Sequence, residues 1–159
     1  MPNLPHSVPH RRQERYGFCL PACVEMVLAY YGINRSQRSL AVELGVIEDV
    51  GAPVAHVKRL AGRHLVATSA TGEESDLLEL LEWGVPPIVA VDTRQLPYWE
   101  ETSAHAIVLA GVTGESSTRL ALIHDPAFPQ PVTVSLGDLL LAWDDLQNVY
   151  AVVRPVHNK

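Results

Sequence analysis

The sequence predicts an α+β protein, and two observations point to that class. Apolar residues make up 47% and charged residues 19% of the 159 residues, a composition that can fill one hydrophobic core. Helical patterns lie mostly in the first half of the chain and strand patterns mostly in the second. Helices followed by strands favour a sheet with helices packed against it. We expect a single domain over residues 1–159, with an irregular, proline-rich arm at residues 1–12.

The expected helices are marked by residues that favour a helix start or end. Proline suits a first helical turn, where its missing N–H would have no intrahelical partner, and Ser36 can cap a helix through its side chain. Glycine is a natural residue after a helix, and Gly32 and Gly84 stand at such positions. The expected helices span residues 21–31, 36–44, 53–61, 75–83 and 136–145.

Strand patterns follow from β-branched and apolar residues between turn signals. The run at 87–91 is continuously apolar and is expected to be buried. The expected strands span residues 64–70, 87–91, 105–112, 119–124, 131–135 and 148–154.

The charge balance argues against several classes of partner. The chain has 18 acidic and 12 basic residues, a formal charge of −6. Nucleic acids and anionic membranes attract positive charge, so neither is an expected partner. The N-terminus lacks the apolar segment of a signal peptide, and the apolar runs are too short to cross a bilayer. We expect a cytoplasmic protein without a membrane segment, in which the cysteines stay reduced.

Cys19 is the candidate nucleophile. It lies just before Pro21, at an expected helix start, where free N–H groups and the helix dipole favour a thiolate. Cys23 lies one turn further on, where a small packing residue would serve. A disulfide between these cysteines and a zinc site are the alternatives. Two cysteines four residues apart are an incomplete zinc set, so we expect neither a metal nor another cofactor.

A hairpin gives Cys19 a possible base. If a five-residue loop at 113–117 joins the strands, Val112 faces Thr118 and His105 faces Asp125. Directly opposed side chains lie about 5 Å apart at their β-carbons. Asp125 would then orient the imidazole and leave its other nitrogen free as a base. A slip of one residue would replace Asp125 with His124, which is therefore expected to point to the opposite face.

Other residues complete a possible site. Gln13 lies six residues before Cys19, and its amide can donate to an oxyanion together with the Cys19 N–H. Tyr98 and Trp99 precede His105 and, with Ala104, are candidate substrate-binding residues. Aromatic side chains in such a loop serve equally well as anchors into the core.

The segment from Gln13 to Gly32 resembles the start of the bacteriocin-processing cysteine peptidases, which act at double-glycine leaders. The resemblance rests on a glutamine, five residues and a cysteine, then an alanine–cysteine pair and a helix ending in Tyr-Tyr-Gly. It continues at His105 and at Asp125-Pro-Ala, and runs in order over residues 13–154. It implies a papain-like fold, in which a helical half carrying the cysteine packs against a bent antiparallel sheet carrying the histidine.

By this resemblance, Cys19 is the nucleophile, His105 the base, Asp125 the orienting acid and Gln13 the oxyanion donor of a peptidase. The family usually has aspartate before the cysteine and glycine after it, whereas Phe18 and Leu20 stand here. We expect the larger Leu20 to line and narrow the substrate cleft. With no transporter segment in the sequence, we do not expect the exporter role.

The expected activity is hydrolysis of a peptide bond in a peptide or protein substrate. A glycine-containing leader or tail is a candidate cleavage site. An acyl or peptidyl transferase of the same fold is an alternative, because the residues of the site do not specify the acceptor. A module that binds a glycine-containing tail without cutting it is another. The oligomeric state is not encoded in any of these patterns.

Overall fold

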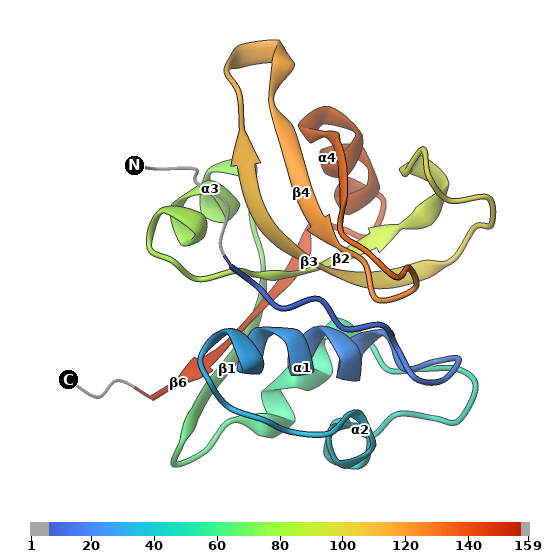
Figure 1. Cartoon of the computed structure of the whole chain (residues 1–159), viewed down its shortest axis with the longest axis vertical. Helices are drawn as coiled ribbons and strands as arrows, with labels where there is room; N and C mark the ends of the chain where they lie inside the picture. Colours follow the sequence, from blue (N-terminus) through green and yellow to red (C-terminus); the bar gives the residue numbers. More distant parts are fainter. Residues whose placement is uncertain (1–6, 157–159) are drawn as a thin grey trace.

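The structure is a computed structural model and describes residues 7–156. Six antiparallel strands form one sheet in the order β1-β6-β2-β3-β4-β5. In Figure 1 the β3–β4 hairpin rises through one half of the molecule, while β1 and β6 run through the other half. The strands are β1 (Leu65–Thr71), β2 (Ile88–Asp92), β3 (Ala104–Thr113), β4 (Leu120–His124), β5 (Val132–Ser135) and β6 (Val149–Pro155).

Helical segments of two kinds accompany the sheet. The α-helices are α1 (Cys19–Tyr30), α2 (Gln37–Leu44), α3 (Glu74–Glu82) and α4 (Leu136–Asp144). The 3-10 helices are η1 (Val54–Leu60), η2 (Thr93–Gln95) and η3 (Ser116–Thr118). Among these described helices, none is long and apolar enough to span a membrane.

Each face of the sheet buries its own hydrophobic cluster. Ala106 and Val108 of β3 join the cluster formed with α1, α2 and η1. Ile107 and Leu109 join the second cluster, formed with α3 and α4. Neighbouring residues of β3 therefore enter opposite clusters, as the two-residue period of a strand requires.

Small side chains bring α1 close to the sheet. Ala90, Ala106 and Ala110 are buried in the cluster that contains α1, and α1 packs directly on β3 and β6. A helix can approach a strand more closely where the facing side chains are alanine. This packing brings the start of α1, with Cys19, to the start of β3, where His105 lies.

The expected α+β class, with its cysteine helix packed on a bent antiparallel sheet, is confirmed. Ser36 caps α2 as expected, its side chain accepting a hydrogen bond from the Ser39 N–H at 3.1 Å. The segment expected to be helical at 53–61 is the 3-10 helix η1, and Pro53 stands just before it. Helix α1 begins at Cys19, two residues before the expected start, so Pro21 still lies in the first turn, where no N–H is needed.

The expected register of the β3–β4 hairpin is wrong. Val108 pairs with His124 and the β3–β4 pairing ends there, so His105 and Asp125 are not paired across the two strands. The connection is longer than expected because η3 lies within it, and a bulge between Leu109 and Gly111 shifts the pairing again. The resulting offset near His124 is two residues. A shift of two residues leaves each side chain of β4 on the face where it was expected. His124 therefore lies on the face of its partner Val108, opposite to that of Ile107.

The part of the N-terminal arm that the structure describes has no regular secondary structure up to residue 13. In Figure 1 this arm runs beside α1, between that helix and the loop after β4. Buried Gln37 holds it on the helical side, accepting a bond from the Glu14 N–H at 2.9 Å and donating to the Arg12 carbonyl at 3.0 Å. On the sheet side, the Gln13 N–H donates to the Pro126 carbonyl at 2.7 Å. The arm thus connects the two halves that carry the site.

Replacing Gln37 with alanine tests the role of this arm. Gln37→Ala removes both bonds to the arm and a third to Glu25 at 2.9 Å, leaving buried polar groups unpaired. We expect the free energy of unfolding to fall by about 2–3 kcal/mol in urea titrations. Gln130→Ala, at an exposed position, is the control and should change stability by less than about 0.5 kcal/mol. Equal stabilities for the two variants would show that Gln37 does not hold the arm.

Candidate active site

Cys19 is the first residue of α1 and follows the N-cap residue Phe18. The N–H groups of a first helical turn have no intrahelical acceptor, and the helix dipole favours negative charge there. Gly17 allows the sharp entry into this helix. Its φ is +86°, and a Cβ at this position would lie 3.3 Å from the backbone nitrogen of Gly51. A half-buried thiol is thereby placed at a helix start that favours a thiolate.

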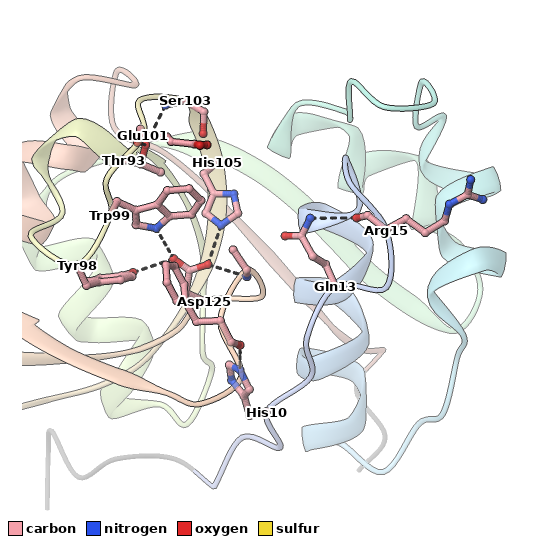
Figure 2. Close-up of polar contacts among 12 residues, drawn as sticks. His10, Gln13, Arg15, Thr93, Tyr98, Trp99, Glu101, Ser103, His105 and Asp125 are labelled. Atoms are coloured by element: carbon pink, nitrogen blue, oxygen red, sulfur yellow. Dashed lines mark hydrogen bonds and ion pairs between the residues drawn. The ribbon is translucent and has the colours of Figure 1, made fainter.

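His105 and Asp125 form a buried pair. His105 Nε2 lies 2.7 Å from Asp125 Oδ1, and the Asp125 side chain is fully buried. The second ring nitrogen, Nδ1, is not used by Asp125 and remains for the Cys19 thiol, whose interaction with His105 raises the pKa of the imidazole. The two residues meet although their strands do not pair at this point, because Asp125 directly follows β4 and its carboxylate reaches the end of β3 (Figure 2).

The pKa values follow from this arrangement. Burial by itself would raise the pKa of Cys19, but the hydrogen bond and charge of His105, with backbone bonds from Ala106 and Leu20, lower it. Burial would lower the pKa of His105, but hydrogen bonds with Asp125 and Cys19 raise it to about 9. Burial would raise the pKa of Asp125, but His105 and further donors lower it. The arrangement therefore favours a thiolate, an imidazolium and a carboxylate in a row.

Asp125 has further partners that sequence reasoning missed. The Tyr98 hydroxyl and the Trp99 Nε1–H each donate to Asp125 Oδ2 at 2.8 Å. The Ala127 N–H donates to Oδ1 at 2.9 Å. We expected Tyr98 and Trp99 to bind substrate, but their polar atoms point to the acid. The only sequence signal for this is that both are aromatic residues with a donor group in the loop before His105.

A cavity of about 400 Å³ opens beside Cys19 and His105. Ala104, a candidate substrate-binding residue, lies in its wall. Leu20 does not line it: this side chain is fully buried in the core against the sheet, so it neither narrows the cleft nor reaches a substrate. The other lining residues are mostly small and apolar: Val50, Ala52, Pro53, Val54, Ala55, Ala90, Ala106, Leu146 and Val149.

Gln13 lies on the helical side of the site, across from His105 (Figure 2). Its Nε2 donates to the Arg15 carbonyl at 3.0 Å. Its Oε1 is buried and has no hydrogen-bond partner among the described residues, and Figure 2 shows this oxygen turned toward the side of His105. The amide nitrogen keeps one N–H that the Arg15 carbonyl does not use.

The remaining histidine and cysteine near the site take no part in the triad of Cys19, His105 and Asp125. His124 Nδ1 lies 3.2 Å from His10 Nδ1, and burial together with His10 lowers the pKa of His124 to about 4. Cys23 is fully buried, and both cysteines are free, so no disulfide joins them. Within residues 7–156 no group of three or more histidine, cysteine or acidic side chains is arranged to hold a metal ion.

Comparison with known proteins places this geometry in a family. The model of the Peptidase_C39 like family matches residues 5–151. The chain belongs to this family. The resemblance to the bacteriocin-processing, double-glycine leader peptidases is thereby confirmed. No protein of curated function matches the sequence.

Solved structures share the fold of this C39 family member at low sequence identity. A double glycine motif protease from an AMS/PCAT transporter, crystallised with the leader peptide, has a TM-score of 0.71 and 23% identity, over 96% of this chain and 94% of that one. A protein provisionally assigned as a C39-like peptidase from Bacillus anthracis has a TM-score of 0.73 and 18% sequence identity, over 100% of this chain and 99% of that one. The peptidase domain of Streptococcus ComA, a bifunctional ABC transporter, has a TM-score of 0.68 and 20% sequence identity, over 92% of this chain and 98% of that one.

The charge state of the triad can be measured directly. We expect alkylation of Cys19 by iodoacetamide to begin at a pH below the ordinary thiol range, and NMR titration of His105 to have its midpoint near 9. In His105→Ala the hydrogen bond and charge that offset most of the burial of the thiol are lost, so the onset of alkylation should move to higher pH. His64→Ala, at an exposed histidine, should keep the wild-type onset. An unchanged onset in His105→Ala would contradict the ion pair.

Proposed function

We propose that this protein is a cysteine peptidase that hydrolyses a peptide bond through Cys19, His105 and Asp125. The observation that carries the proposal is the short buried bond between His105 and Asp125, beside a thiol with a lowered pKa at a helix start. These groups are what nucleophilic thiol catalysis requires. Membership of the C39 family supports the same activity.

The chemistry follows from the arrangement. The Cys19 thiolate attacks the carbonyl carbon of the scissile bond and forms a C–S bond, while the carbonyl oxygen becomes an oxyanion. Protonated His105 gives its proton to the leaving amine as the C–N bond breaks. The same imidazole then takes a proton from water, which attacks the thioester and releases the acid together with the Cys19 thiolate. Asp125 stabilises the imidazolium form of His105 in both steps.

The oxyanion would be held by donors on the helical side. Cys19 is the first residue of α1, so its N–H has no intrahelical acceptor. Gln13 would add its side-chain N–H. In the structure the Gln13 nitrogen is bonded to Arg15, so this role requires the second N–H, or a turn of the amide, to face the oxyanion.

The substrate we propose is a peptide with an apolar side chain near the cleaved bond. The cavity beside Cys19 is lined mainly by alanine and valine, which accept an aliphatic side chain and leave a charge without a partner. A structural relative is a double glycine motif protease seen with a leader peptide, so a glycine-containing leader or tail is the first candidate. We also propose a single catalytic domain and a cytoplasmic location, where the free thiols would remain reduced.

The alternatives gain no support from the geometry. A bulky Leu20 in the cleft would favour a non-catalytic binding module, but Leu20 is buried in the core. A transferase would use the same triad, and an acceptor amine added to the assay separates the two reactions. Hydrolysis without incorporation of the amine supports the peptidase.

The test is cleavage of a peptide library that includes segments with two consecutive glycines. We expect Cys19→Ala to reduce kcat/KM by more than about 1,000-fold, because the nucleophile is lost. Cys23→Ala, which removes the buried neighbour on the same helix, should retain activity. If the wild-type protein is alkylated at Cys19 yet cleaves no peptide of the library, the peptidase proposal fails. Peptide binding without cleavage would favour the binding module instead.

A further inference from the structure

Asp125 places a negative charge where its side chain is fully buried, and four donors surround it. Oδ1 accepts from His105 Nε2 at 2.7 Å and from the Ala127 N–H at 2.9 Å. Oδ2 accepts from the Tyr98 hydroxyl and the Trp99 Nε1–H, each at 2.8 Å. Figure 2 shows Tyr98 and Trp99 converging on the acid from the side away from Gln13. The oxygen that does not face His105 is thus held by two side chains of one loop.

These two donors suit a carboxylate. An indole N–H can only donate, so Trp99 requires an acceptor at Oδ2 and disfavours a protonated oxygen there. Burial and the charge of Asp125 raise the pKa of Tyr98, which keeps its hydroxyl protonated and able to donate. With Oδ2 held from two directions, the carboxyl group cannot rotate without breaking two charge-assisted hydrogen bonds.

Ring packing fixes the same loop against the base. The Trp99 ring contacts the His105 ring edge-on, with centroids 4.9 Å apart and an interplanar angle of 66°. Both Tyr98 and Trp99 pack edge-on against Phe128, at 5.1 and 5.3 Å. Phe128 follows Asp125 closely in the chain, so the loop of the two aromatic residues is packed against the loop that carries the acid.

The base of the loop is tied by Thr93, which is fully buried. The Thr93 hydroxyl donates to the Glu101 carbonyl at 2.7 Å and accepts from the Ser103 N–H at 2.8 Å. Thr93 therefore ties the two ends of residues 93–103 together immediately before β3. Neither Tyr98 nor Trp99 belongs to the lining of the cavity beside Cys19.

We propose that Tyr98 and Trp99 are positioning residues, which hold Asp125 Oδ2 so that Oδ1 points at His105 and the imidazole stays directed at Cys19. They act through Asp125 and do not touch the substrate. The inference rests on the proposed peptidase function for its kinetic consequence. Its effect on the charge state of the triad does not require any substrate.

The test uses Tyr98→Phe, Trp99→Phe and the double variant, which keep an aromatic ring at each position and remove the donors. We expect the NMR midpoint of His105 to fall below its wild-type value near 9, and the onset of Cys19 alkylation to move to higher pH. With a cleaved peptide, each single variant should lose about tenfold in kcat, the loss expected for one hydrogen bond to a charged group, with KM changed less than about twofold.

Matched controls separate this role from general stability. Tyr30→Phe removes a hydroxyl that donates to the Gly84 carbonyl, and Trp83→Phe changes an exposed indole. Both should keep the wild-type His105 midpoint and alkylation onset. If the Trp99→Phe protein does not fold, replacement of Trp99 by benzothienylalanine, which keeps the ring shape and lacks the N–H, is measured in its place.

Two results would overturn the proposal. One is a wild-type His105 midpoint and alkylation onset in the folded double variant. The other is a rise in KM with kcat unchanged, which would assign Tyr98 and Trp99 to substrate binding. If the wild-type protein cleaves no peptide, the proposed function fails, whereas the NMR and alkylation measurements still decide whether these two residues position the acid.

Discussion

The buried charge of Asp125 is the feature on which the site depends. A carboxylate taken out of water is strongly destabilising unless donors surround it, and here the side chain is fully buried. His105, Tyr98, Trp99 and the backbone of residue 127 supply those donors. Because one of them is an imidazole, the compensation of the charge also raises the pKa of His105 to about 9. The imidazolium then lowers the pKa of Cys19, so one buried charge determines the state of the nucleophile.

The triad is assembled across two layers of the fold. Cys19 belongs to α1, whereas His105 and Asp125 belong to the sheet and the loop after it. Their distance is therefore set by how α1 docks, and the alanines on the facing strands allow a close approach. The N-terminal arm adds a second connection, bonded to Gln37 on one side and to the Pro126 carbonyl on the other. Membership of the C39 family and the likeness to its solved structures fit this arrangement.

Local patterns were reliable where local physics decides. Ser36 caps α2 through its own side chain, and the apolar run of β2 is buried on both faces, as expected from its composition. Patterns failed where the outcome depends on geometry between elements. The turn at η3 and the bulge after Leu109 moved the hairpin register, and neither has a strong signal in its residues. The contact between His105 and Asp125 is nevertheless present, since the acid reaches the base from the end of its strand.

The sequence by itself determined the class of the fold, the order of its elements and the place of Cys19 at a helix start, because periodicity and caps are local properties of the chain. It pointed to His105 and Asp125 only through the resemblance to a known family, since the register that paired them is not the one in the structure. Only the tertiary structure decided which way Leu20 faces and what Tyr98 and Trp99 contact. Leu20 lies in the core, and the two aromatic residues bond to Asp125. The physical reason is that a buried carboxylate selects its donors from whatever segments the fold brings within reach, and that choice is made between residues far apart in the chain.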